Sequence, residues 1–455
     1  MCRYKKAIFS LIIGFFFVNI LPQPLYAVKS YPNEPEVFAE SAVLIDAKTG
    51  DILYGKSENS RMYPASITKL MTALIAIETR RPSDTIVMSQ EAVFGIERNS
   101  SHIGLDVDEQ ITLDQGLHAL LLNSANEVAN GIAELCDGSI EAFARHATNR
   151  AKELGAKNTN FVNPHGLHDP NHYTSAYDMA LISRELLNQP YFLEIMGNHS
   201  YQIPPTNKCD EVRHMSQSHK LLHEARYGRS YRPDVIGGKT GYTTDAGNTL
   251  VTIAKQGDLE LICVVLKSDS YNLYSDTNAI LDYGFDNYKS ISLHQKDNVI
   301  KSIPMYSIKS GQLIHVADCD ICVEECSNFL AGSDIKERNI DTIINLPDKI
   351  DGQASKGDII GTVSYQYMGK ILYENNLVIN EINHLPSAEP IVYPEKPKYA
   401  VPNFILSYNT NFLYITLAIM CLALMILFIA FINYRNTCKL RKKSKKILRF
   451  SKTIK

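Results

Sequence analysis

The stretch Pro64-Ala65-Ser66-Ile67-Thr68-Lys69 leads into a segment whose apolar residues recur with helical spacing. Residues three apart on a helix share a face, so the amine of Lys69 lies within reach of the hydroxyl of Ser66. A serine hydroxyl is a poor nucleophile until a base removes its proton. A lysine serves as that base when desolvation and a nearby positive charge lower its pKa. The stretch therefore predicts a nucleophile, Ser66, and a base, Lys69, at the start of a helix.

This spacing is weak evidence alone, because the chain repeats it at Ser333–Lys336 without supporting groups. Two further motifs follow in sequence, Ser124-Ala125-Asn126 after an apolar helix and Lys239-Thr240-Gly241 in a glycine-flanked strand. A hydroxyl beside a lysine can pass on a proton, and a carboxamide can orient a substrate amide. Each motif has one or more copies elsewhere, at Lys48–Gly50, Ser57–Asn59 and Ser270–Asn272. Only the ordered combination is specific, and it is the set found in penicillin-binding proteins and class A β-lactamases.

The chain resembles the low-molecular-mass D-alanyl-D-alanine carboxypeptidases, the serine peptidases related to penicillin-binding protein 5. Three longer stretches carry the resemblance, namely Leu121–Asn126, Asn163-Pro164-His165-Gly166-Leu167 and Gly238–Thr243. It is strong over residues 35–290 and looser in the region of Gly357-Asp358-Ile359-Ile360-Gly361. The implied fold is an α/β catalytic domain of the β-lactamase/transpeptidase-like type, an antiparallel sheet with a helical region.

The resemblance also implies a mechanism. Ser66 attacks the carbonyl between the two terminal D-alanines of a peptidoglycan stem peptide, with Lys69 as base. The backbone N–H groups of Ser66 and Tyr242 form the oxyanion hole, and Ser124 passes a proton to the departing D-alanine. The remaining substrate-binding residues are Asn126 for the amide, Lys239 and Thr240 for the terminal carboxylate, and Gly241 of the same motif. β-Lactams would acylate Ser66 as covalent inhibitors, and the resemblance implies neither a cofactor nor a metal.

The chain departs from the family pattern at Gln217-Ser218-His219-Lys220-Leu221-Leu222, where family members often carry Asn-x-Asn-x-Leu-Leu. Some relatives have an arginine in that stretch, and this chain has none there. We therefore expect binding of the substrate carboxylate to depend more on Lys239 and Thr240. Tyr242 stands where some members have histidine, which a backbone role tolerates. We expect a structural role for His165, since Lys69 already supplies the base.

Three other functions share these residues. A β-lactamase needs rapid deacylation, commonly through a dedicated glutamate and water, and no loop convincingly supplies one. A D,D-endopeptidase acting on peptide cross-links would use the same chemistry. A non-catalytic peptidoglycan-binding protein on the same fold is disfavoured, because all the catalytic groups are present.

The rest of the α/β unit follows from periodicity. A strand hairpin is expected at residues 41–45 and 52–54, and a second one at 248–255 and 260–267, separated by turn-forming residues. Helices are expected at residues 113–122, 127–136, 143–154, 176–187 and 277–285. Short strands and turns over residues 291–384 predict a small β-sandwich domain, followed by a proline-rich linker at residues 385–410.

The two ends of the chain predict export and membrane anchoring. Residues 1–27 have a basic start, an apolar run and a small-residue end, the pattern of a signal peptide. Residues 412–432 carry no charge and are long enough for a transmembrane helix. The tail at residues 433–455 is basic, which favours a cytoplasmic location. We therefore expect a single-pass protein of the cell membrane whose catalytic domain is extracytoplasmic.

The composition of the chain limits its possible partners and the roles of its cysteines. The chain has 455 residues and a formal net charge of -3, so nucleic acid is not expected as a partner. Export permits disulfides, and the cluster Cys319, Cys322 and Cys326 could form one or bind a metal. No nearby histidine completes a zinc set, and no cysteine is assigned a catalytic role.

Overall fold

The computed structural model describes residues 34–386. A five-stranded sheet, antiparallel throughout, has the strand order β2-β1-β9-β8-β7. Its strands are β1 (Ser41–Asp46), β2 (Ile52–Lys56), β7 (Val235–Thr243), β8 (Gly247–Gln256) and β9 (Leu259–Ser268). Both predicted hairpins are present, and the Lys48–Gly50 copy lies in the turn between β1 and β2.

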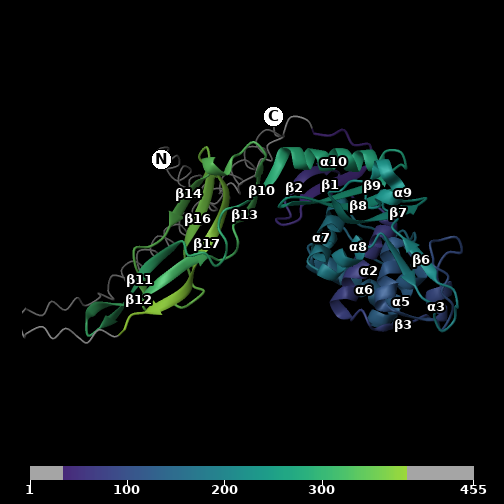
Figure 1. Cartoon of the computed structure of the whole chain (residues 1–455), viewed down its shortest axis with the longest axis horizontal. Helices are drawn as coiled ribbons and strands as arrows, with labels where there is room; N and C mark the ends of the chain where they lie inside the picture. The colour runs from purple at the N-terminus through teal and green to yellow at the C-terminus, as the bar shows by residue number, and fades with distance from the viewer. Residues whose placement is uncertain (1–33, 387–455) are drawn as a thin grey trace, which may run out of the picture. The chain divides into compact units, whose positions relative to one another are not determined.

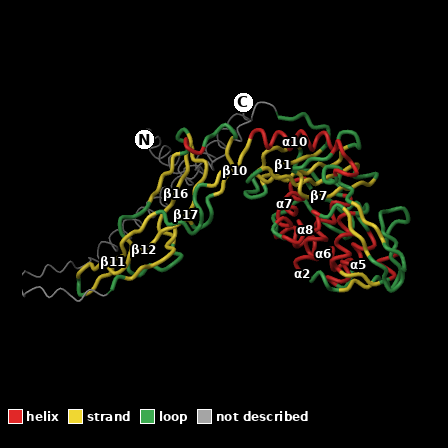
Figure 2. The backbone as a smooth tube through the Cα atoms, viewed as in Figure 1, coloured by secondary structure: helices red, strands yellow, loops and turns green. Residues whose placement is uncertain are grey.

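Helices cover both faces of this sheet (Figure 1). One face carries α10 (Leu273–Asn287), and the other carries the helical region, which Figure 2 shows as a cluster of red segments. The helical region comprises α2 (Lys69–Thr79), α4 (Leu113–Leu122), α5 (Asn126–Asp137), α6 (Ile140–Glu153), α7 (Ala176–Leu187) and α8 (Pro190–Gly197). This is the predicted α/β catalytic fold.

Strand alternation explains the two cores. In β1, Val43 and Ile45 point into the core beneath the helical region, while Ala42 and Leu44 belong to the core under α10. Successive side chains of a strand face opposite sides, so a sheet covered on both faces reads as a continuous apolar run. All six residues of β1 are buried, as that arrangement requires.

Smaller elements connect these layers. They are the short helices α3 (Gln90–Phe94) and α9 (Glu224–Tyr227), the 3₁₀ turns η1 (Ala65–Thr68) and η2 (Gly228–Ser230), and two small hairpins. The hairpins pair β3 (Thr85–Val87) with β4 (Gln110–Thr112), and β5 (Ser200–Ile203) with β6 (Arg213–Ser216).

The C-terminal β domain has a separate core. Its six-stranded sheet has the order β14-β16-β17-β12-β11-β15, and β10 (Tyr288–Ser292) pairs with β13 (Asn328–Gly332) as a two-stranded ribbon. The sheet strands are β11 (Lys301–Lys309), β12 (Gln312–Val323), β14 (Asp341–Asn345), β15 (Ile350–Asp351), β16 (Ile359–Tyr367) and β17 (Lys370–His384). A 3₁₀ turn, η3 (Glu337–Asn339), precedes β14. Phe329 of the ribbon stacks on Tyr365 and Tyr373 of the sheet, so ribbon and sheet share one core in place of two full sandwich layers.

Within residues 34–386, no helix is both long and apolar enough to cross a bilayer. The predicted signal peptide, transmembrane helix and basic tail lie outside the described residues, as do all but the first two residues of the predicted linker.

Candidate active site

Ser66 lies in the 3₁₀ turn η1, directly before α2. The preceding Ala65 has a φ of 52°, a left-handed conformation that a residue with a Cβ rarely adopts. Two hydroxyl groups hold the turn in place: Thr68 Oγ1 donates to the carbonyl of Ala65 at 2.8 Å, and Thr249 Oγ1 of β8 donates to that of Pro64 at 2.8 Å. The central sheet thus supports the strained entry to the helix, as is common where strain has a function.

Lys69 begins α2 and is fully buried. Its Nζ lies 3.0 Å from Ser66 Oγ, 2.6 Å from Asn126 Oδ1 and 2.7 Å from the carbonyl oxygen of His165. A neutral amine has two N–H donors, for which the oxygens of Asn126 and His165 are acceptors, and one lone pair, which is left for the hydroxyl of Ser66. The predicted pairing of Ser66 with Lys69 is therefore present, and Asn126 holds the lysine as well as facing the pocket.

The pKa of Lys69 lies well below its usual value. Burial is the largest cause, because a buried amine loses the solvation of its charged form. The positive charge of Lys239 lowers the pKa further, and the carboxylate of Glu127 opposes both effects. A neutral amine next to Ser66 Oγ is the state that a general base requires.

Lys239 sits on β7 and is also buried. Its Nζ donates to the carbonyl of Thr240 at 2.9 Å, and burial lowers its pKa to about 7. Thr240 Oγ1 lies 3.1 Å from Ser218 Oγ, so two hydroxyl groups adjoin at this end of the site. In its protonated form, Lys239 places a positive charge beneath the surface of the cavity.

Gly241 lies directly beside Ser66. A Cβ at this position would be 2.8 Å from the backbone nitrogen of Ser66 and 2.4 Å from Thr249 Oγ1. Only a residue without a side chain lets β7 approach η1 so closely. The side chain of the next residue, Tyr242, is 65% exposed, which agrees with a role for its backbone alone.

Ser124 lies in the loop between α4 and α5 and has a φ of 61°. Its Oγ is buried and has no hydrogen-bond partner among the described residues. Burying a hydroxyl without a partner costs free energy. A substrate group that completes this bond would offset the cost, which suits the predicted role in proton transfer.

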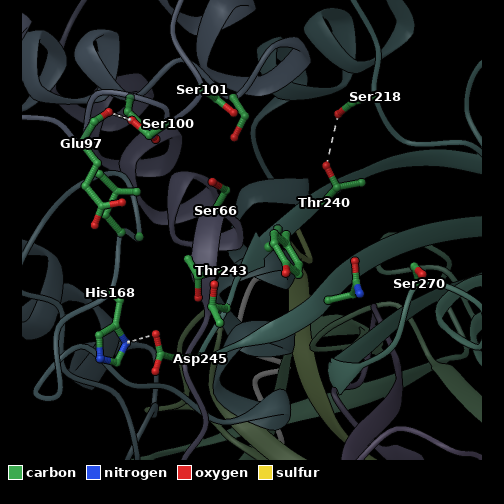
Figure 3. A pocket seen from close by; sticks show the side chains of 18 of the residues that line it. Ser66, Glu97, Ser100, Ser101, His168, Ser218, Thr240, Thr243, Asp245 and Ser270 are labelled. Carbon is green, nitrogen blue, oxygen red and sulfur yellow. Dashed lines mark hydrogen bonds and ion pairs between the residues drawn. The ribbon is translucent and has the colours of Figure 1, made fainter.

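These residues line or adjoin one cavity of about 680 Å³ (Figure 3). Of the eight predicted site residues, six line it: Ser66, Ser124, Asn126, Thr240, Gly241 and Tyr242. Lys69 and Lys239 lie just beneath. Figure 3 shows Ser218 and Thr240 on one side of Ser66, and Glu97, His168 and Asp245 on the other.

The stretch Asn163–Leu167 has a part in the site that its residue types alone did not reveal. The carbonyl of His165 holds Lys69, while its buried imidazole accepts from the N–H of Leu167 at 3.1 Å. Burial keeps the pKa of His165 well below its usual value, which favours the neutral ring. Its hydrogen bond to the backbone of Leu167 fits the expected structural role. Gly166 has a φ of 87°, and a Cβ there would lie 1.8 Å from the carbonyl oxygen of Ala65. The sequence signal for this close approach was the glycine within the family-like stretch Asn163–Leu167, because glycine permits a positive φ and close backbone contact.

The serine of the Ser333–Lys336 copy is bonded to the backbone, whereas Ser270 of the Ser270–Asn272 copy lines the cavity. Ser333 Oγ donates to the carbonyl of Asp286 at 2.7 Å, so this serine is not paired with Lys336.

The thiols of Cys319, Cys322 and Cys326 are free, with no disulfide between them. In residues 34–386, no group of three or more His, Cys, Asp or Glu side chains is arranged to hold a metal ion.

Comparison with known proteins gives two family matches. Residues 28–270 match the D-alanyl-D-alanine carboxypeptidase family, and residues 288–382 match the penicillin-binding protein 5 C-terminal domain. Among curated proteins, the D-alanyl-D-alanine carboxypeptidase DacF of Bacillus subtilis is 29% identical over 83% of this chain and 94% of its own length. The carboxypeptidase DacA of Haemophilus influenzae is 29% identical over 76% of this chain and 86% of its own. Among solved structures, penicillin-binding protein 5 of Haemophilus influenzae has a TM-score of 0.66 at 25% identity, covering 78% of this chain and all of the other.

Proposed function

The chain belongs to the D-alanyl-D-alanine carboxypeptidase family of serine peptidases, and we propose that it removes the terminal D-alanine from peptidoglycan stem peptides through an acyl-enzyme on Ser66. The observation that carries this proposal is the 3.0 Å contact between Ser66 Oγ and a buried Lys69 whose pKa is well below its usual value. The other side chains assigned to the reaction line or adjoin the same cavity.

Acylation begins when the neutral amine of Lys69 takes the proton of Ser66 Oγ. The oxygen attacks the carbonyl carbon of the penultimate D-alanine, and the carbonyl oxygen gains negative charge. Preorganised backbone N–H groups stabilise such charge, here those of Ser66 and Tyr242. The C–N bond then breaks, and the nitrogen of the departing D-alanine takes a proton through Ser124, which Lys69 replenishes.

Deacylation uses the same groups in reverse. Lys69 takes a proton from water, whose oxygen attacks the ester carbonyl, and the proton returns to Ser66 Oγ as the ester bond breaks. Asn126 orients the peptide amide, Thr240 binds the C-terminal carboxylate, and the charge of Lys239 attracts it. A β-lactam forms the same ester with Ser66 and keeps its leaving group attached, which makes it an inhibitor.

The test is labelling of the protein with a fluorescent penicillin, together with release of D-alanine from a pentapeptide ending in two D-alanines. We expect Ser66→Ala to abolish both. The matched control is Ser333→Ala, which removes the serine of the unsupported spacing and should leave both unchanged. Labelling that survives in Ser66→Ala would overturn the nucleophile assignment, and labelling without D-alanine release would overturn the carboxypeptidase assignment.

Export and anchoring form a second part of the proposal. Residues 1–27 direct secretion, and residues 412–432 hold the catalytic domain on the outer side of the cell membrane, with residues 433–455 in the cytoplasm. The support is the pattern of charge and hydrophobicity in these segments. The full chain should remain in the membrane fraction of a bacterial host, and a chain ending at residue 411 should be released. Retention of the shortened chain would contradict an anchor at residues 412–432.

A further inference from the structure

Glu127 is a buried carboxylate to which the proposed mechanism assigns no part. It follows Asn126 in the first turn of α5 and is 2% exposed. Its Oε1 accepts the N–H of Ile103 at 2.6 Å and that of Gly104 at 3.2 Å. Its Oε2 is buried and has no hydrogen-bond partner among the described residues. Burying a carboxylate oxygen in this way costs free energy, which an apolar residue of the same size would avoid.

The segment that Glu127 holds is part of the cavity wall. Ser100 and Ser101 line the cavity (Figure 3), and they come just before the two amides that Glu127 accepts. The carbonyl of Ser101 accepts the N–H of Asn126 at 2.8 Å. Two consecutive residues of α5 therefore tie this wall to the helix start from which Asn126 contacts Lys69.

Glu127 also places a negative charge near Lys69. The preceding residue, Asn126, lies 2.6 Å from Lys69 Nζ, so the base and the carboxylate belong to the same buried region. The charge of Glu127 raises the pKa of Lys69, whereas burial and the charge of Lys239 lower it. Burial raises the pKa of Glu127 itself, and the two amide N–H groups and the charge of His102 lower it. Lys69 is thus exposed to two opposite charges, a cation on β7 and an anion on α5.

The histidines beside Lys69 favour their neutral forms. The carbonyl of His165 holds Lys69, and the ring of His172 lies 2.9 Å from Thr68 Oγ1, one residue before the base. Burial keeps the pKa of His165 well below its usual value and lowers that of His172 to about 3. The charge that opposes Lys239 at this base is therefore that of Glu127.

A second buried carboxylate, Glu109, holds the same segment but has a cationic partner. Its Oε1 lies 2.7 Å from Arg213 Nη1, and Arg213 Nη2 donates to the carbonyl of Gly104 at 2.8 Å. The charge of Glu109 is balanced by this guanidinium group. Glu127 has no comparable ion pair in the part of the chain that the structure describes.

From these contacts we infer that Glu127 is a positioning residue of the active site. Its carboxylate fixes the cavity wall at residues 101–104 against α5, and its unpaired charge sets the pH range in which Lys69 works as a base. The inference rests on the proposed acylation of Ser66.

The test of the charge uses Glu127→Gln, which keeps an oxygen for the amides of Ile103 and Gly104 and removes the negative charge. A negative neighbour favours the protonated form of Lys69, so its loss favours the neutral amine. The rising limb of penicillin labelling against pH should move to lower pH. At a fixed pH on that limb, labelling should become roughly 3- to 10-fold faster, while the plateau rate should change little.

Two variants separate this effect from a loss of structure. Glu127→Asp keeps the charge, so its limb should stay at the wild-type pH even if the shorter side chain lowers the plateau. Glu109→Gln removes the other buried carboxylate of the segment, whose charge is paired with Arg213, and should leave the limb in place. An unmoved limb in Glu127→Gln would overturn the inference, and so would an equal movement in Glu109→Gln.

The hold on the cavity wall is tested by amide hydrogen exchange. Glu127→Leu fills the space but offers no acceptor, so the amides of Ile103 and Gly104 should exchange at least about 10-fold faster than in the wild-type protein. In Glu127→Gln their exchange should stay close to that of the wild type. Unchanged exchange in Glu127→Leu would show that the carboxylate does not hold this segment.

Failure of the proposed function is distinguishable from failure of this inference. If penicillin does not label the wild-type protein, the proposed acylation of Ser66 is wrong. The charge effect is then decided by an NMR titration of the Lys69 side chain, whose signal is identified by its loss in Lys69→Met. A lower titration midpoint in Glu127→Gln would support the inference, and an unchanged midpoint would contradict it.

Discussion

At the scale of single residues, the proposed mechanism depends on two lysines that the fold removes from water. Lys69 and Lys239 are both buried, and each has a pKa below the usual value for lysine. Desolvation is the main cause for both, and the charge of Lys239 adds to it at Lys69. Burial and a like charge together favour the neutral amine that the proposed role of Lys69 as base requires.

The pH dependence of acylation should follow Lys69. The amine works only when deprotonated, so labelling by penicillin should rise with pH and level off above the lowered pKa. In Lys239→Met the pKa of Lys69 should rise, since a positive neighbour is lost, and the rising limb should move to higher pH. The displacement should be clearest below about pH 7, where Lys239 is itself charged. Labelling rates measured across pH test this, and an unmoved or acid-shifted limb would contradict it.

Ser124→Ala should separate activity from stability. Because Ser124 Oγ has no partner among the described residues, its removal should change the free energy of unfolding by less than about 0.5 kcal/mol. D-alanine release should fall by about 10²- to 10⁴-fold, as for loss of an acid–base group. Thermal unfolding and turnover measured on one preparation check both halves. A large loss of stability would point to a structural role for this hydroxyl.

At the scale of elements, the site is made by contact between one strand and one helix start. Strand β7 brings Gly241 against η1, and β8 supplies the hydroxyl that holds the turn at Pro64. The loop containing Gly166 closes on the same turn from another direction. Both glycines are required because backbone passes within contact distance of backbone.

Gly241→Ala should damage the site more than the fold. The new methyl group would meet Ser66 N and Thr249 Oγ1, so β7 must shift away from the nucleophile. We expect penicillin labelling to slow by about 10²- to 10³-fold, the usual effect of a displaced oxyanion hole. Gly197→Ala is the control, because a Cβ there meets nothing within 4 Å. Near-normal labelling of Gly241→Ala would show that the close approach is not needed.

At the scale of the whole molecule, the catalytic sheet and the β domain have different cores. The residues buried around the five-stranded sheet form two clusters, and those of the β domain form a third. A cavity in one core should leave the packing of the others intact, because such costs are local.

Ile379→Ala, in β17, tests this independence. Ile379 is 1% exposed, and a cavity there should destabilise the β domain by about 2–5 kcal/mol. Labelling of Ser66 at 25 °C should stay unchanged. The matched variant Ile253→Ala, in β8 of the catalytic sheet, should cost a similar amount and also slow labelling. Slower labelling in Ile379→Ala would show that the β domain supports the active site.

Local sequence patterns were sufficient to predict much of the fold. The helices predicted at residues 113–122 and 176–187 have the bounds of α4 and α7, and both predicted hairpins form neighbouring strands. Helical and strand periodicity depend on which side chains face a core, which is visible in the order of residues. Short pieces with little periodicity, such as α8 and the β5–β6 hairpin, were not predicted.

The sequence by itself determined the family and the order of the three motifs, and it predicted Ser66 as the nucleophile, because these depend on residue types at fixed spacing. Only the tertiary structure decided how the residues act. It showed that Asn126 and the carbonyl of His165 hold Lys69, that Lys239 is buried while Lys220 faces the cavity, and that Gly241 touches η1. Burial and contact between distant segments set these contacts and pKa values, and neither property is encoded in local spacing.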